Sequence, residues 1–129
     1  MNKHGFSLIE LLVVIAIIGI LVAVGAASYL TAQKQVRDTR RKADLSEIRQ
    51  ALETYRAEEG VYPDNATWQA DLSPEYITQV PQDPSGGSYS YTPGAAPIVS
   101  YAICAQLEIT PSSVDNDCGS SYNYALNNP

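Results

Sequence analysis

The chain has 129 residues and a formal net charge of −6, from 8 Lys and Arg against 14 Asp and Glu. Residues 57–129 carry no Lys or Arg, so a domain built from them repels phosphate backbones and we expect no direct binding of nucleic acid. The one histidine, His4, lies near the N-terminus. This leaves the domain no Ser-His or Cys-His pair for nucleophilic catalysis and predicts that the protein is not an enzyme.

An apolar stretch over residues 6–32 is the first predicted element. Between Leu11 and Ala27 no side chain is charged or forms hydrogen bonds. A helix over residues 6–32 would be about 40 Å long at ~1.5 Å per residue, which is enough to cross a hydrocarbon core of ~30 Å. Glu10 is the only charged side chain in this stretch, and a carboxylate near a bilayer interior costs at least ~2.5–3.5 kcal/mol. The sequence therefore predicts a membrane-spanning helix whose single charge needs a partner.

The residues around Gly5 distinguish this stretch from a secretory signal peptide. The small residue lies before the apolar region, so a cut after Gly5 would leave the helix on the mature protein. The run Gly5-Phe6-Ser7-Leu8-Ile9-Glu10 and its apolar continuation resemble the prepilin cleavage and methylation motif of the type IV pilin superfamily. The resemblance implies cleavage between Gly5 and Phe6 by a prepilin peptidase and N-methylation of Phe6. It also implies that Glu10 neutralises the N-terminal amine of an adjacent subunit during assembly.

The helical pattern continues beyond the apolar stretch. No Pro or Gly occurs from residue 26 to 59, and Gly60 followed by Pro63 provides a stop. We therefore expect one helix over residues 6–59, membrane-spanning in its first half and amphipathic in its second. Asp38 and Arg41 have the spacing of an i,i+3 ion pair, and Asp44 is expected on the solvent face. The apolar stripe of the second half comprises Leu45, Ile48, Leu52 and Tyr55.

The remaining chain predicts a small antiparallel sheet. A loop with one helical turn at residues 68–72, and a second helix start at Ser73, precedes three strands over residues 88–92, 99–107 and 122–126. Alternation predicts that the odd-numbered residues from Val99 to Leu107 face the helix. The expected fold class is α+β and pilin-like, a long N-terminal helix on about three strands. Its expected domains are a leader over residues 1–5, a transmembrane and assembly helix over 6–32, and a globular head over 33–129.

Two cysteines, Cys104 and Cys118, have a spacing compatible with a disulfide and no nearby histidine for a metal site. A structural disulfide is our interpretation, and it places the head in an oxidising compartment. The cations of residues 34–42 give the opposite orientation by the positive-inside rule. We favour the disulfide and the prepilin motif, which predict an inner-membrane protein crossing once, with a cytoplasmic N-terminus and the head outside.

A calcium site is the one metal hypothesis. Asp115, Asn116 and Asp117 form an oxygen-rich run, with Asp83 as a further candidate ligand, and the resemblance to major pseudopilins implies calcium in such a loop. The run lacks EF-hand spacing, so a polar turn held by Cys118 is the preferred interpretation. Asp83 is otherwise expected on a solvated face, with Asp71 and Glu75. We expect no other cofactor.

The resemblance implies a structural subunit of a bacterial type IV pilus-like filament, extracellular or periplasmic. Its implied partners are copies of itself and related pilins, a prepilin peptidase and an inner-membrane assembly platform. A major pseudopilin of type II secretion is the second hypothesis. The segments at residues 59–63, 80–84 and 89–91 resemble both classes. Their Tyr-Pro and Asp-Pro elements favour the pseudopilin, whereas the cysteine pair favours the pilus. A plain membrane-anchored binding domain is the third, and it has no use for the Gly5-Phe6 junction.

Overall fold

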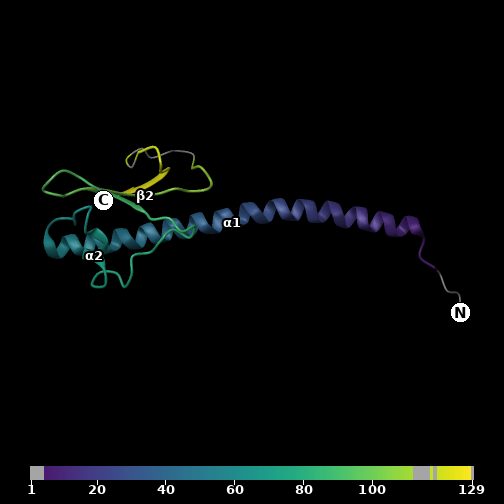
Figure 1. The fold of residues 1–129 in the computed structure, drawn as a ribbon, viewed down its shortest axis with the longest axis horizontal. Coiled ribbons are helices and arrows are strands. Elements are labelled where there is room, and N and C mark those ends of the chain that lie inside the picture. Colours follow the sequence, from purple (N-terminus) through teal and green to yellow (C-terminus); the bar gives the residue numbers. More distant parts are fainter. Residues whose placement is uncertain (1–4, 112–116, 118, 129) are drawn as a thin grey trace. The chain divides into compact units, whose positions relative to one another are not determined.

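The computed structural model describes residues 5–111, 117 and 119–128, in two compact units over residues 1–34 and 35–129. The elements are helix α1 (Leu8–Glu59), helix α2 (Trp68–Leu72) and strands β1 (Ser90–Pro93), β2 (Tyr101–Ala105) and β3 (Tyr124–Asn127) (Figure 1). This arrangement confirms the predicted α+β, pilin-like fold with three antiparallel strands.

Within the first unit, α1 is apolar on every side. Its large apolar side chains from Leu8 to Leu30 are 43–82% exposed, because none of the described residues of this unit packs over them. By length and composition α1 contains one segment able to cross a membrane. The helix begins at Leu8, two residues later than predicted, and it ends at Glu59 as predicted. Gly60 follows with φ +79°, the left-handed conformation that glycine adopts at helix ends.

In the second unit, the predicted stripe of α1 forms the centre of the core. Leu45, Ile48 and Leu52 are fully buried, and each contributes about 1.5–3 kcal/mol relative to an exposed position. Tyr55 packs at the edge of this cluster. The aromatic and aliphatic residues that cover the stripe come from the loop, from α2 and from the sheet: Tyr62, Trp68, Leu72, Ile77, Tyr89, Tyr91, Tyr101, Ile103 and Ala105.

The sheet has the order β1-β2-β3, with Tyr91 opposite Ile103 and Ile103 opposite Leu126. Val99 contradicts its prediction, since it is 49% exposed and precedes the strand, which begins only at Tyr101. The alternation itself is confirmed within β2, because Tyr101, Ile103 and Ala105 lie in the core cluster of the α1 stripe. All five residues of β2 are nevertheless buried, since the other face is covered too. On the second face, Ala102 and Cys104 pack with Ala125 and Tyr122, so the C-terminal segment covers the side expected to meet solvent.

The helix start predicted at Ser73 is also wrong. Helix α2 ends at Leu72, and residues 73–76 form turns. Ser73 has an extended conformation, with φ −106° and ψ 137°. Proline disfavours the helical conformation in the residue before it, so Pro74 ends α2 instead of starting a new helix.

Candidate functional site

The predicted processing junction lies directly before the first helix. Gly5 and Phe6 precede α1, and Phe6 is 78% exposed. The peptide bond between them therefore lies outside any helix or strand. The cleavage itself stays a prediction.

A capping arrangement explains why α1 begins at Leu8. The carbonyl of Ser7 accepts hydrogen bonds from the backbone N–H of Glu10 (3.1 Å) and of Leu11 (3.3 Å). The carboxylate of Glu10 accepts one from the backbone N–H of Ser7 at 3.2 Å. This is one half of a capping box, in which a Glu three residues after the cap binds back to it. The spacing Ser7-x-x-Glu10 before an apolar run was the sequence signal for this start, and the prediction of Phe6 overlooked it.

Apart from the Ser7 N–H, only the helix dipole compensates the charge of Glu10 within the described residues. It lies in the first turn of α1, where the positive end of the helix dipole favours a carboxylate by about 0.3–1 kcal/mol. The ion pairs in the described part of the chain join Arg37 or Arg41 to Asp38, Asp83 or Glu108, so none involves Glu10. In an apolar surrounding this carboxylate therefore still needs a cation from outside the described residues.

A buried charge cluster in the head was not predicted. Arg41, only 3% exposed, donates to Asp83 from Nε (2.6 Å) and Nη2 (2.9 Å) and to Asp38 from Nη1 (2.7 Å). It also reaches Glu108 at 3.2 Å, and Arg37 binds Glu108 with both Nε and Nη2. The i,i+3 pairing of Asp38 and Arg41 is confirmed. The cluster fastens the loop around Asp83 and the segment after β2 onto α1.

The cluster shifts the pKa values of Glu108, Asp83 and Arg41. Hydrogen bonding by Arg37, with further help from Arg41, lowers the pKa of Glu108 to about 2. The hydrogen bond from Arg41 likewise lowers the pKa of Asp83, and the bond to Asp83 raises the pKa of Arg41 above its usual range. All these groups therefore remain charged across the physiological pH range.

Asp44 and Asp83 are not on the solvent-exposed surface expected of them. Asp44 is buried and accepts a hydrogen bond of 2.7 Å from the hydroxyl of Tyr89. Burial, together with this bond, raises the pKa of Tyr89. Asp83 is bound by Arg41 and by the backbone N–H of Ser85 at 2.7 Å. The side-chain partners Tyr89 and Arg41 lie 45 and 42 residues away in the sequence, so no local pattern revealed them.

The described residues neither support nor test the calcium hypothesis. Both carboxylate oxygens of Asp83 accept hydrogen bonds from Arg41, and Asp117 accepts a hydrogen bond from Asn127 at 2.8 Å. Across residues 5–111, 117 and 119–128, no three His, Cys, Asp or Glu side chains are grouped to hold a metal ion. Asp115 and Asn116 lie outside these residues.

The cysteine pairing also stays a prediction. Cys104 is fully buried on the outer face of β2, beside Ala102 and Ala125. Cys118 lies outside the described residues.

Comparisons with known proteins agree with the motif and the fold. A family model described as the prokaryotic N-terminal methylation motif matches residues 1–26, and one described as type II secretion system protein G matches residues 28–106. The type II secretion system core protein G of Pseudomonas aeruginosa is 30% identical, over 92% of this chain and 94% of its own length. The type IV wide pilus major component PilA4 of Thermus thermophilus is 44% identical, over 50% of this chain and 49% of its own. The type IV major pilin PilA of Myxococcus xanthus is 32% identical, over 74% of this chain and 39% of its own. No solved structure matches.

Proposed function

We propose that this chain, which belongs to the family of type II secretion system protein G, is a structural subunit of a pilin-type helical filament. The observation that carries the proposal is the uncovered helix of the first unit. Its apolar side chains surround the helix and are exposed over residues 8–30, which is far more apolar surface than a soluble monomer tolerates. A bilayer covers this surface before assembly, and the same helices of neighbouring subunits cover it in the filament.

Processing prepares this helix for assembly. We infer that a prepilin peptidase cleaves after Gly5 and that the new N-terminal residue, Phe6, is N-methylated. The methylation motif, the exposure of Phe6 and the helix start at Leu8 support this inference. The chemistry is supplied by the processing enzyme and a methyl donor, so the role of this chain is structural.

Glu10 sets the axial register of the subunits in the filament. The cut at Gly5 creates an α-amine in the same apolar region as the Glu10 carboxylate. Subunits that pack at the wrong height leave both ions unpaired, which costs several kcal/mol in a medium of low dielectric. We infer that Glu10 accepts the amine of a neighbouring subunit, and that the bond from Ser7 N–H holds the carboxylate near the helix start until then.

Two kinds of filament fit this subunit. The match over nearly the whole chain favours the pseudopilus of type II secretion, because the type IV pilins match about half of this chain or less than half of their own length. The predicted Cys104–Cys118 disulfide favours a type IV pilus. In both cases we infer a single crossing of the inner membrane, with a cytoplasmic N-terminus and the head outside. The assembled filament is periplasmic or extracellular.

Mass spectrometry and electron microscopy test the proposal together. We expect the mature protein to begin at N-methylated Phe6 and to form filaments, whereas Glu10→Ala reaches the membrane but yields few filaments. The matched control is Glu47→Ala, since Glu47 is exposed on α1 within the head. A mature chain that still begins at Met1, or filaments of Glu10→Ala at the wild-type yield, would contradict the proposal. Deleting the gene and comparing secreted proteins with surface filaments separates secretion from a pilus.

A further inference from the structure

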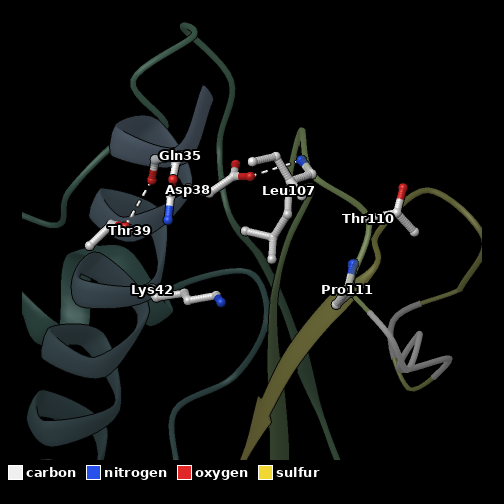
Figure 2. Close-up of a pocket in the computed structure, with 8 residues that line it drawn as sticks. Gln35, Asp38, Thr39, Lys42, Leu107, Thr110 and Pro111 are labelled. Atoms are coloured by element: carbon white, nitrogen blue, oxygen red, sulfur yellow. Dashed lines mark hydrogen bonds between the residues drawn. The ribbon is translucent and has the colours of Figure 1, made fainter. Parts of the chain in front are cut away.

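A groove of about 350 Å³ opens in the second unit, between α1 and the segment that follows β2. Gln35, Thr39 and Lys42 form its helical wall, and Leu107 and Pro111 are on the opposite wall (Figure 2). One wall is thus polar and the other is largely apolar. Figure 2 shows the Lys42 side chain extending from the helix into the gap between the two walls.

Lys42 supplies the net charge of this groove. Asp38 also lines it, but Arg41 neutralises that carboxylate at 2.7 Å, and the backbone N–H groups of Glu108 and Ile109 bind it at 2.9 and 2.8 Å. The Lys42 ammonium lies 5.3 Å from the centre of the Tyr124 ring, and no described ion pair involves it. A ring occupies one side of an ammonium and leaves hydrogen-bond donors for an acceptor.

The other end of the same unit is acidic. Glu58 and Glu59 are exposed in the last turn of α1, and Glu75 is exposed after α2. The hydroxyl of Tyr76, the residue after Glu75, donates a hydrogen bond to Glu58 at 2.8 Å, which connects the turn after α2 with the end of α1. This hydrogen bond, followed by burial and the charges of Glu58, Glu75 and Glu59, raises the pKa of Tyr76 to about 12. Residues 57–129 hold no Lys or Arg. Arg56, the one cation in the last turn of α1, donates to the hydroxyl of Tyr62 at 3.0 Å and is in no described ion pair with these carboxylates.

One copy cannot join its own groove to its own acidic end. Lys42 and Glu59 lie on one helix and are separated by about 25 Å at ~1.5 Å per residue. We propose that the groove at Lys42 binds the acidic end, Glu58, Glu59 and Glu75, of a second copy of this chain. A contact between two different surfaces can repeat along an open helix when its rotation does not close into a ring, and a helical filament requires such a contact. The inference rests on the proposed filament function and adds a head-to-head contact to the packing of the apolar helices.

Zero-length carbodiimide cross-linking detects this contact directly. We expect a peptide containing Lys42 to be joined to one containing Glu58, Glu59 or Glu75. Mixing isotope-labelled with unlabelled full-length protein identifies links between copies. The measurement works on filaments and equally on protein in membranes, so it reports on the contact even where no filament forms. Absence of a mixed-label link at Lys42 overturns the inference.

A charge exchange tests how much the contact between the groove and the acidic end contributes to filament assembly. We expect Lys42→Glu and Glu59→Lys each to lower the filament yield about fivefold at low salt, and the double variant to recover most of the loss. The matched controls are Arg40→Glu and Glu47→Lys, which make the same charge changes at exposed positions of α1 outside the groove and the acidic end. Equal effects of the control and test variants, or no recovery in the double variant, overturn the inference.

The remaining outcomes separate this contact from its alternatives. Filaments of Lys42→Glu at wild-type yield refute the groove contact and leave the proposed function intact, whereas a wild-type chain without filaments refutes the proposed function. A lipid headgroup is the other anion that an ammonium near a membrane can bind. If anionic phosphatidylglycerol protects Lys42 from acylation in vesicles of unassembled protein, and neutral phosphatidylcholine does not, the occupant is lipid and the inference is wrong.

Discussion

Arg41→Met removes the cation at the centre of the buried charge cluster. Wild-type Arg41 makes bonds of 2.6–2.9 Å to Asp83 and Asp38, and its side chain is 3% exposed. The variant leaves these two carboxylates, which are 12% and 8% exposed, without a cation. Removing one member of a buried ion pair costs about 3–5 kcal/mol. Small domains have a total stability of about 5–15 kcal/mol, so the loss is a large share of what holds the head together.

The assay is thermal unfolding of the full-length protein in detergent micelles, followed by the near-ultraviolet circular dichroism of its tyrosines. For a domain of this size a loss of 3–5 kcal/mol lowers the midpoint by roughly 15–30 °C. The control is Arg37→Met. The Arg37 side chain is 34% exposed, and ion pairs at exposed positions contribute only about 0–1 kcal/mol. We therefore expect a shift of a few degrees at most for the control.

A second variant isolates the physical cause. If the cost comes from uncompensated buried charge, Arg41→Met combined with Asp83→Asn is more stable than Arg41→Met alone, because one stranded carboxylate has become neutral. An Arg41→Met midpoint within a few degrees of the wild type would refute the reasoning. A double variant that is less stable than the single one would refute it too, since the loss would then come from packing rather than charge.

The remaining predictions concern pH, the core and the cysteines. Because the folded-state pKa of Glu108 falls from 4.5 to about 2 and that of Asp83 is also lowered, their stabilising contribution is complete above about pH 5. It is lost as the pH falls toward 2, so acid titration of unfolding shows this slope in the wild type and a shallower one in Arg41→Met. Leu52→Ala creates a cavity at a fully buried position and lowers the unfolding free energy by about 2–5 kcal/mol in denaturant titration, whereas Ala57→Gly on the exposed face of α1 costs about 1 kcal/mol. Non-reducing peptide mapping joins Cys104 to Cys118, and Cys104→Ser lowers stability by roughly 3 kcal/mol; two free thiols in mature protein would contradict the pairing.

Local sequence patterns were enough to predict the core face and the end of helix α1. The spacing of Leu45, Ile48 and Leu52 placed the core face of α1, and Gly60 placed its end at Glu59. Both depend on contacts within a few residues. The start at Leu8 is equally local, because it depends on the bond between Ser7 and Glu10, whereas the apolar run alone predicts a start at Phe6. The strands were located to within a few residues, since alternation indicates a strand but not where its pairing begins.

The sequence by itself determined that an apolar helix with one carboxylate, Glu10, follows a processing motif, because length, hydropathy and motif spacing are properties of consecutive residues. Beyond the local Asp38–Arg41 pair, only the tertiary structure decided which charges of the head meet. Arg41, Asp44 and Asp83 are residue types usually found at surfaces, yet they are buried or largely buried because the Arg41–Asp83 and Asp44–Tyr89 contacts join distant segments of the chain. The same packing paired Arg37 and Arg41 internally and left Lys42 in an open groove. Which cation is free to bind another molecule depends on contacts between residues far apart in the sequence, and these exist only in the folded chain.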